Sequence, residues 1–181
     1  FGSGDAEVSK IGVVVRSKDG SKQTPDLFVQ VSDTKNKFEP VDPVKEAMPS
    51  GCSHGINYNP DGSVTVVLYD KDKNGASYDW CYVIGDFSGW QRQSEYAMKR
   101  DDAAGCWWYT FTGVDPDREY MFQYYLGKKD GTATKVHDPY TEIVYDGYND
   151  KYITSTTYPD LPAYPEGTSG LVSAFKVNKD S

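Results

Sequence analysis

Carboxylates are the most numerous side chains with catalytic potential in this chain, which has 27 Asp and Glu residues against 19 Lys and Arg. General acid–base catalysis needs such a group held within hydrogen-bond reach of the proton that it transfers. Several aspartates fall instead in predicted turns, where Asp is favoured because its side chain accepts hydrogen bonds from the nearby backbone. These are Asp70, Asp72, Asp101, Asp102, Asp115 and Asp117. Their pattern favours a structural role over a catalytic pair.

Histidine and cysteine could supply a nucleophile or metal ligands, but their spacing favours neither. His54 and His137 have no convincing nucleophile or ligand partner, and three cysteines are too few for a disulfide scaffold. Cys81 and Cys106 lie on predicted strands, and they either pair across facing strands or remain buried free thiols. We expect no metal, no cofactor and no catalytic activity in the chain as given.

Aromatic side chains offer a different chemistry, since they make up 14% of the chain and include 15 Tyr and 4 Trp. An aromatic ring can lie against the apolar face of a sugar ring while polar groups around it bind the hydroxyls. Aromatic residues also fit the pleated surface of a sheet, and the 17 Gly and 10 Pro residues favour turns. The composition therefore predicts a protein of strands and turns.

The charge balance restricts the partners of the chain. A net charge of -8 and a pI near 4.7 oppose binding to phosphate backbones, so we expect no nucleic-acid partner. The longest apolar runs cover residues 11–15 and 64–69, far short of the roughly 20 residues of a membrane-spanning helix. We expect no transmembrane segment.

The N-terminal part divides into two segments. Apolar runs at residues 11–15 and 27–31 flank an Asp19-Gly20 turn signal and predict a hairpin. We interpret residues 1–35 as the closing strands of a preceding β-domain. Residues 36–55 are polar and rich in Pro and Gly, a composition typical of a linker.

Short strand-like runs then recur about every ten residues, which is typical of an antiparallel sandwich and not of a βαβ fold. They cover residues 64–69, 80–84, 96–99, 107–111, 120–126 and 134–136. Side chains alternate between the two faces of a strand. The alternation predicts a core that contains Trp107, Tyr109, Phe111, Phe122 and Tyr124. It places on the outward surface Trp108, Gln123 and Tyr125.

Four motifs follow one another in this region: Val83-Ile-Gly-Asp-Phe-Ser-Gly-Trp90, Trp107-Trp-Tyr-Thr-Phe-Thr-Gly-Val114, Glu119-Tyr-Met-Phe-Gln-Tyr-Tyr-Leu126 and His137-Asp-Pro-Tyr140. Together they resemble the family 48 carbohydrate-binding modules, the isoamylase-type N-terminal domains. The resemblance implies an all-β fold, an immunoglobulin-like antiparallel β-sandwich over residues 56–153, with an additional β segment before it.

Residues 138–142, 149–153 and 158–167 are similar to bacterial α-amylase-type enzymes of glycoside hydrolase family 13, in which such a module precedes a catalytic barrel. The similarity implies that residues 154–181 form an extended linker into a following catalytic domain. It also implies that this domain of the same chain is a partner, and that the location is extracellular, cell-surface or periplasmic.

The resemblance also selects binding residues. In glycogen-binding relatives the Trp of the Gly-x-Phe-x-x-Trp signature stacks on glucose, and here this residue is Trp90. Gln123 replaces a sugar-binding Lys and can still donate a hydrogen bond, whereas Lys135 replaces a second stacking Trp. Asn149 matches a sugar-binding Asn. For an interface with a neighbouring domain we select Trp108, Tyr125 and Tyr148.

Two functions from different classes follow from this resemblance. A non-catalytic module that binds α-glucan, such as starch or glycogen, would raise the effective substrate concentration at the catalytic domain. A structural spacer would instead dock on the catalytic barrel and stabilise it without binding sugar. A module of an esterase is a third alternative, which the Tyr- and Pro-rich sequence of residues 158–167 disfavours.

Overall fold

The computed structural model describes residues 10–24, 27–30, 38–70, 75, 77–159 and 161–178. The chain divides into two compact units, residues 1–39 and residues 40–181. None of the helices in this described part has the length and hydrophobicity that crossing a bilayer requires.

The first unit contains the predicted hairpin. β1 (Lys10–Val13) and β2 (Leu27–Gln30) pair in antiparallel orientation. Between them, the Asp19 carboxylate accepts hydrogen bonds from the Ser17 hydroxyl and from the N–H and hydroxyl of Ser21. These hydrogen bonds lower the pKa of Asp19 to about 2. The assignment of the hairpin to a preceding domain stays a prediction.

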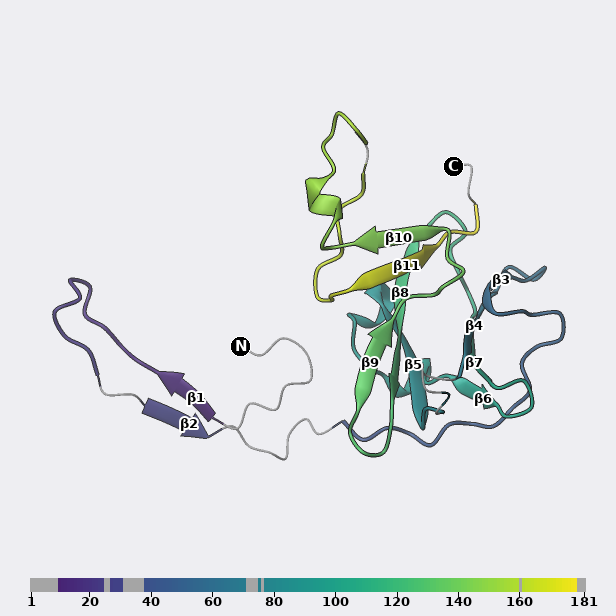
Figure 1. Ribbon diagram of the computed structural model, residues 1–181, viewed down its shortest axis with the longest axis horizontal. Helices are drawn as coiled ribbons and strands as arrows, with labels where there is room; N and C mark the ends of the chain where they lie inside the picture. Colours follow the sequence, from purple (N-terminus) through teal and green to yellow (C-terminus); the bar gives the residue numbers. More distant parts are fainter. Residues whose placement is uncertain are drawn as a thin grey trace. The chain divides into compact units, whose positions relative to one another are not determined.

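Two antiparallel sheets form a sandwich in the second unit (Figure 1). One sheet has the order β10-β11-β8-β5, with β9 also paired to β8, and the other has the order β3-β4-β7-β6. The first sheet contains β5 (Trp80–Gly85), β8 (Tyr120–Gly127), β9 (Ala133–Val136), β10 (Ile143–Asp146) and β11 (Leu171–Phe175). The second contains β3 (Gly55–Tyr58), β4 (Val64–Tyr69), β6 (Lys99–Asp101) and β7 (Cys106–Phe111). The prediction of an all-β, immunoglobulin-like sandwich is confirmed.

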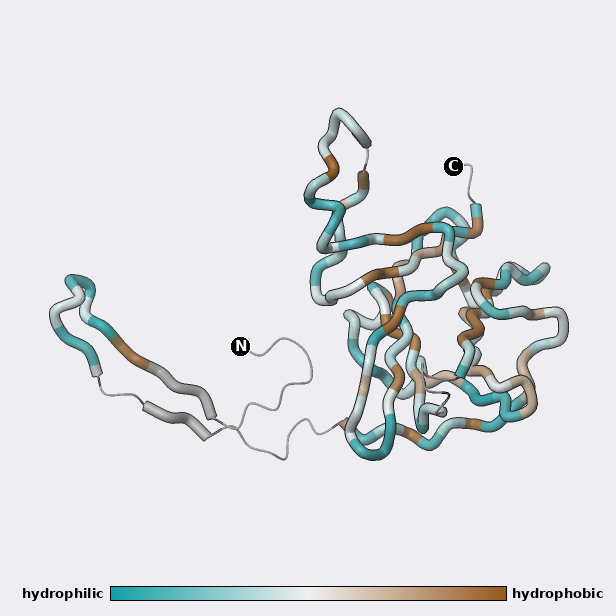
Figure 2. The backbone as a smooth tube through the Cα atoms, in the orientation of Figure 1, coloured by the Kyte–Doolittle hydropathy of each residue, from teal (hydrophilic) through white to brown (hydrophobic). Residues whose placement is uncertain are grey.

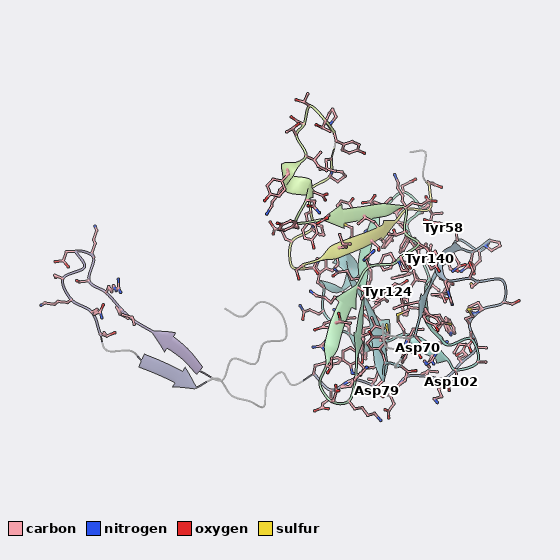
Figure 3. All side chains as sticks on the ribbon, viewed as in Figure 1. Tyr58, Asp70, Asp79, Asp102, Tyr124 and Tyr140 are labelled. Carbon is pink, nitrogen blue, oxygen red and sulfur yellow. The ribbon has the colours of Figure 1, made fainter. Side chains whose placement is uncertain are left out.

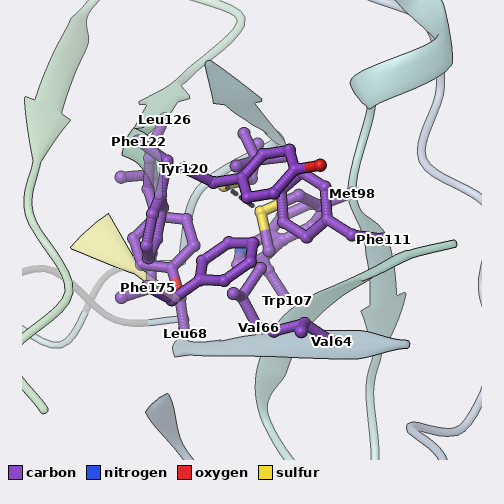
Figure 4. Close-up of a cluster of buried hydrophobic side chains, with 13 residues drawn as sticks. Val64, Val66, Leu68, Met98, Trp107, Phe111, Tyr120, Phe122, Leu126 and Phe175 are labelled. Atoms are coloured by element: carbon purple, nitrogen blue, oxygen red, sulfur yellow. Dashed lines mark hydrogen bonds between the residues drawn. The ribbon is translucent and has the colours of Figure 1, made fainter. Parts of the chain in front are cut away.

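Side chains from both sheets fill the space between them (Figure 4). Trp107 on β7 and Phe122 and Tyr124 on β8 are fully buried in this core, as the alternation predicts. Tyr109 packs against the same core but is only partly buried. Many of the hydrophobic positions in Figure 2 lie along the strands of the sandwich.

The strand predicted at residues 96–99 begins later in the structure. Residues 94–96 form the 3-10 helix η2 (Ser94–Tyr96), and the Met98 N–H donates a hydrogen bond to the Cys81 carbonyl at 2.9 Å. The chain therefore joins the second sheet only at β6.

Residues 40–52, which composition predicts as linker, lie along the edge of the second sheet. The Arg100 N–H in β6 donates to the Val44 carbonyl at 2.8 Å, and the Glu46 N–H donates to the Arg100 carbonyl at 3.0 Å. The Met48 N–H donates to the Asp101 carboxylate at 2.9 Å. This segment satisfies backbone groups that an uncovered edge strand would expose.

The C-terminal segment also differs from the expected linker. β11 lies inside the first sheet, where Ser173 is paired with Phe122 of β8 and with Val144 of β10. Because its residues 172–175 are buried, β11 belongs to the sandwich, and the expected lead into a following domain stays a prediction. The residues between β10 and β11 form the loop above the sandwich in Figure 1, which includes η3 (Asp150–Tyr152).

A buried carboxyl group joins β11 to the rest of the first sheet. Asp138 is fully buried and accepts hydrogen bonds from the Tyr124 hydroxyl at 2.5 Å and the Tyr140 N–H at 2.8 Å. Its own N–H donates to the Ser173 hydroxyl at 2.7 Å. Burial raises the pKa of Asp138, although these two hydrogen bonds and His137 act in the opposite direction.

This raised pKa predicts a pH dependence of stability. The pKa of an Asp carboxyl is about 3.9 in the unfolded chain, and that of Asp138 is higher in the folded chain. At pH values between the two, Asp138 binds more protons in the folded chain than in the unfolded chain. The contribution of Asp138 to the free energy of unfolding therefore decreases as pH rises through this window. We expect Asp138→Asn to remove that decrease in urea unfolding measured between pH 4 and 7. Asp61→Asn is the control, because the Ser63 hydroxyl lowers the pKa of exposed Asp61, so that its contribution changes only below the pKa of the unfolded chain and its replacement should leave the slope between pH 4 and 7 unchanged.

Candidate functional site

Trp90, the predicted sugar platform, is covered by the protein's own chain. It follows η1 (Asp86–Ser88), has a backbone φ of 62°, and its N–H donates to the Gly85 carbonyl at 2.8 Å. Only 9% of the residue is exposed. Gly167 lies directly against the indole, since a Cβ at this position would be 3.1 Å from Trp90 Cδ1. The ring is therefore not an open surface for a sugar.

Gln123 binds the same C-terminal segment. Its side-chain NH2 group donates to the Ser169 carbonyl at 2.9 Å and the Leu171 carbonyl at 2.8 Å. Its side-chain oxygen accepts from the Thr168 hydroxyl at 2.6 Å. Along one edge of β8, the paired strand changes from β11 to β9 at Gln123. The Gln123 side chain therefore binds the segment that leads into β11.

Lys135 completes this arrangement, and Asn149 stays apart from it. The Lys135 ammonium lies 3.4 Å from the Thr168 hydroxyl, so three of the four predicted residues converge on residues 167–171. Asn149 is exposed, and its side chain donates to the Asp146 carboxylate at 2.5 Å. We call the surface formed by Trp90, Gln123 and Lys135 the Trp90 face.

Two of the predicted interface residues are packed within the second unit. Trp108 is buried beneath residues 44–52, and its indole N–H donates to the Glu46 carbonyl at 2.9 Å. Met48 and Cys52 pack against the same cluster. Tyr125 is half-buried, and the Arg92 guanidinium lies 4.6 Å from the centre of its ring. The Trp108 ring is covered within the unit, whereas Tyr125 remains partly exposed and its interface role stays a prediction.

Tyr148 differs, because 71% of it is exposed on the loop between β10 and β11. Its ring centre lies 6.3 Å from that of Tyr152, and the Lys151 ammonium lies 5.1 Å from both. The carboxylate of Asp146 accepts a hydrogen bond from the Tyr148 N–H at 3.0 Å and so fixes the turn. Tyr148 is therefore the most exposed of the three predicted interface residues, and its interface role stays a prediction.

The aspartates that were assigned to turns have structural partners. Asp101 accepts hydrogen bonds from the Ala104 and Met48 N–H groups, and Asp115 accepts one from the Asp117 N–H. Asp70 and Asp102 form ion pairs, and Asp72 lies outside the described residues. Among the residues that the structure describes, no three His, Cys, Asp or Glu side chains gather as a metal site would require.

The cysteines are free thiols in the structure. Cys81 lies in the core against Met98, with the two sulfur atoms 3.2 Å apart, whereas Cys106 lies 3.9 Å from the sulfur of Met48. Burial raises the pKa of both thiols, that of Cys106 to about 11. The sequence left open whether Cys81 and Cys106 pair with each other or remain buried free thiols, and in the structure they are buried free thiols.

The structure contains a hollow of about 420 Å³. It lies beside β3, β10 and β11, and Tyr58 and Tyr140 line it (Figure 3). Tyr140, which ends the His137-Asp-Pro-Tyr140 motif, is 62% exposed. The lining residues come from positions between 56 and 176, so no local motif could reveal them.

The chain matches no model of a known protein family and no curated protein sequence.

Proposed function

We propose that residues 40–178 form a non-catalytic supporting module of an α-glucan-acting, α-amylase-type glycoside hydrolase, and that the Trp90 face binds the module's own chain and not sugar. The association with a glycoside hydrolase rests on the resemblance, and the observation that favours a supporting role is the presence of residues 167–171 on the face selected for sugar. Gln123 uses both N–H groups and the oxygen of its side-chain amide on this segment. This favours the spacer hypothesis. From the resemblance we also propose the following catalytic domain of the same chain as partner and an extracellular, cell-surface or periplasmic location.

Glucan binding on the Trp90 face is the second candidate, because Trp90, Gln123 and Lys135 do converge there. Sugar would have to displace residues 167–171 and break the three hydrogen bonds of Gln123, each of which contributes about 0.5–1.5 kcal/mol net. Leu171 limits this displacement, since it already belongs to β11 and is paired with Asp146.

Affinity electrophoresis in gels with and without glycogen tests the proposal. Lys135→Ala removes a polar group of the Trp90 face, and Lys129→Ala makes the same charge change at an exposed position outside it. We expect glycogen to change the mobility of the wild type and both variants equally. Retardation of the wild type and Lys129→Ala, but not of folded Lys135→Ala, would overturn the proposal in favour of the second candidate.

A further inference from the structure

A second hollow, of about 260 Å³, is lined mainly by aromatic rings that three elements bring together. Phe87 comes from η1, Tyr96 from η2, and Tyr109 and Phe111 from β7. The ring centre of Tyr96 lies 4.9 Å from that of Phe87 and 6.0 Å from that of Tyr109. The ring centre of Phe111 lies 4.9 Å from that of Tyr109 and 5.1 Å from that of Phe87, so the four rings form a closed circuit. We call this site the Phe87 hollow.

Three of these rings pack against the core without being covered by it. Phe111 is buried in the core and is labelled in Figure 4, whereas Phe87, Tyr96 and Tyr109 are only partly buried. The hollow explains why Tyr109, which alternation assigns to the core, stays partly accessible. Aromatic surface that stays open around a concavity marks a binding surface.

Glu95 gives the Phe87 hollow a negative charge. It is an exposed lining residue, and among the residues that the structure describes no Lys or Arg forms an ion pair with it. Burial raises the pKa of Tyr96, and the Glu95 carboxylate raises it further. Burial, Tyr96 and Glu95 together raise the pKa of Tyr109. Because the faces of aromatic rings are also negative, the hollow attracts cations and repels anions.

One wall of the hollow already holds a cation against an aromatic ring. The Arg118 guanidinium lies 4.6 Å from the centre of the Tyr120 ring, which lines the hollow. Asp86 forms an ion pair with this guanidinium at 2.9 Å. Asp86 therefore balances the charge of Arg118, and the carboxylate of Glu95 is left for a ligand.

These features select an organic cation. Calcium and magnesium ions take six or more oxygen ligands, whereas Glu95 is the single carboxylate among the described lining residues. A primary ammonium group is compact and strongly hydrated, so it loses much of its hydration among aromatic rings. A quaternary ammonium group spreads its charge over its methyl groups, and aromatic rings bind it by cation–π attraction. The volume of about 260 Å³ lies just below the roughly 300–1,000 Å³ of sites for drug-sized ligands, which suits so small a group.

We infer that the Phe87 hollow binds a quaternary ammonium group, with the rings of Tyr96 and Tyr109 against its methyl groups and the Glu95 carboxylate as its counter-charge. The site shares no residue with the Trp90 face. The inference therefore goes beyond the proposed function and does not depend on it.

Titration with choline chloride, followed by NMR of the backbone amides, tests the inference. We expect the amide signals of residues that line the Phe87 hollow to shift and to saturate with choline. Sodium chloride at the same concentrations controls for ionic strength. The neutral analogue of choline in which carbon replaces nitrogen has the same shape, and it should bind at least about fivefold more weakly because it lacks the cation–π attraction.

Two variants locate the binding. Glu95→Gln preserves side-chain size and should weaken choline binding about threefold or more, whereas Glu166→Gln makes the same charge change at an exposed position outside the hollow and should leave it unchanged. Tyr96→Leu should weaken binding about fivefold, with Tyr152→Leu as its control at a 69% exposed position. Because Glu95 is exposed, its variant covers the case in which Tyr96→Leu fails to fold.

Phosphatidylcholine vesicles present the same group on a membrane. Binding of choline alone identifies a free cation as the ligand, and cosedimentation with the vesicles that Glu95→Gln weakens identifies a lipid headgroup; each supports the inference. The inference is overturned if neither probe binds or if the neutral analogue binds as tightly as choline. Equal choline affinity in the wild type and folded Glu95→Gln also overturns it.

Discussion

Replacing Arg100 by Met is expected to lower the free energy of unfolding of the sandwich by about 3–5 kcal/mol, because it leaves a buried carboxylate without its counter-ion. Asp70 is fully buried, and the Arg100 guanidinium lies 2.7 Å from its carboxylate. Within the described residues, the Asp70 oxygens accept no hydrogen bond of good geometry. Arg100 also donates to the carbonyls of Asp101 and Cys106, which the variant leaves without this donor.

Urea unfolding monitored by Trp fluorescence measures this loss. The control is Lys45→Met, because the ion pair between Lys45 and Asp102 is 2.8 Å long but its side chains are 70% and 55% exposed. Exposed pairs of this kind contribute about 0–1 kcal/mol. The double variant Arg100→Met with Asp70→Leu should recover part of the stability, since it buries no unpaired charge. An equal loss in Arg100→Met and Lys45→Met would contradict the prediction.

The sandwich could be predicted from the sequence because alternation is a local signal. Trp107 and Trp108 are adjacent and point to opposite faces, and the structure places Trp107 in the core between the sheets. The same rule correctly put Trp108 on the other face. It could not show that residues 44–52 cover this face, because a Pro-rich segment has no period that reveals its contacts.

The closure of the Trp90 face depends on contacts that are distant in sequence. Gln123 and Ser169 are 46 positions apart, and Pro and Gly between residues 159 and 170 suggested a linker. The apolar residues of β11 were visible as a strand-like run, but nothing local specified that the strand would insert between β8 and β10. Of the four residues selected by resemblance, Trp90, Gln123 and Lys135 converge on residues 167–171 and Asn149 lies apart, an arrangement that only the three-dimensional structure reveals.

The first glycine of the Gly85-Asp-Phe-Ser-Gly-Trp90 motif is expected to tolerate no side chain. Gly85 ends β5, and a Cβ there would lie 2.2 Å from the Met121 carbonyl oxygen and 2.4 Å from the Phe87 ring. Because Met121 contributes a backbone atom in β8, relief requires the two strands to separate. We expect Gly85→Ala to lower the free energy of unfolding by about 3 kcal/mol, the upper part of the usual range for overpacking.

Gly89→Ala in the same motif separates this steric effect from the general cost of replacing glycine. Gly89 has a φ of 60°, and a Cβ there would meet no atom within 4 Å. The left-handed conformation alone costs roughly 1–2 kcal/mol for a residue with a side chain. Urea unfolding of both variants should therefore rank Gly85→Ala as the less stable. A loss of stability in Gly89→Ala equal to or greater than that in Gly85→Ala would contradict the prediction. It would mean that Gly85 does not set the distance between β5 and β8, and that the position of Trp90 has another cause.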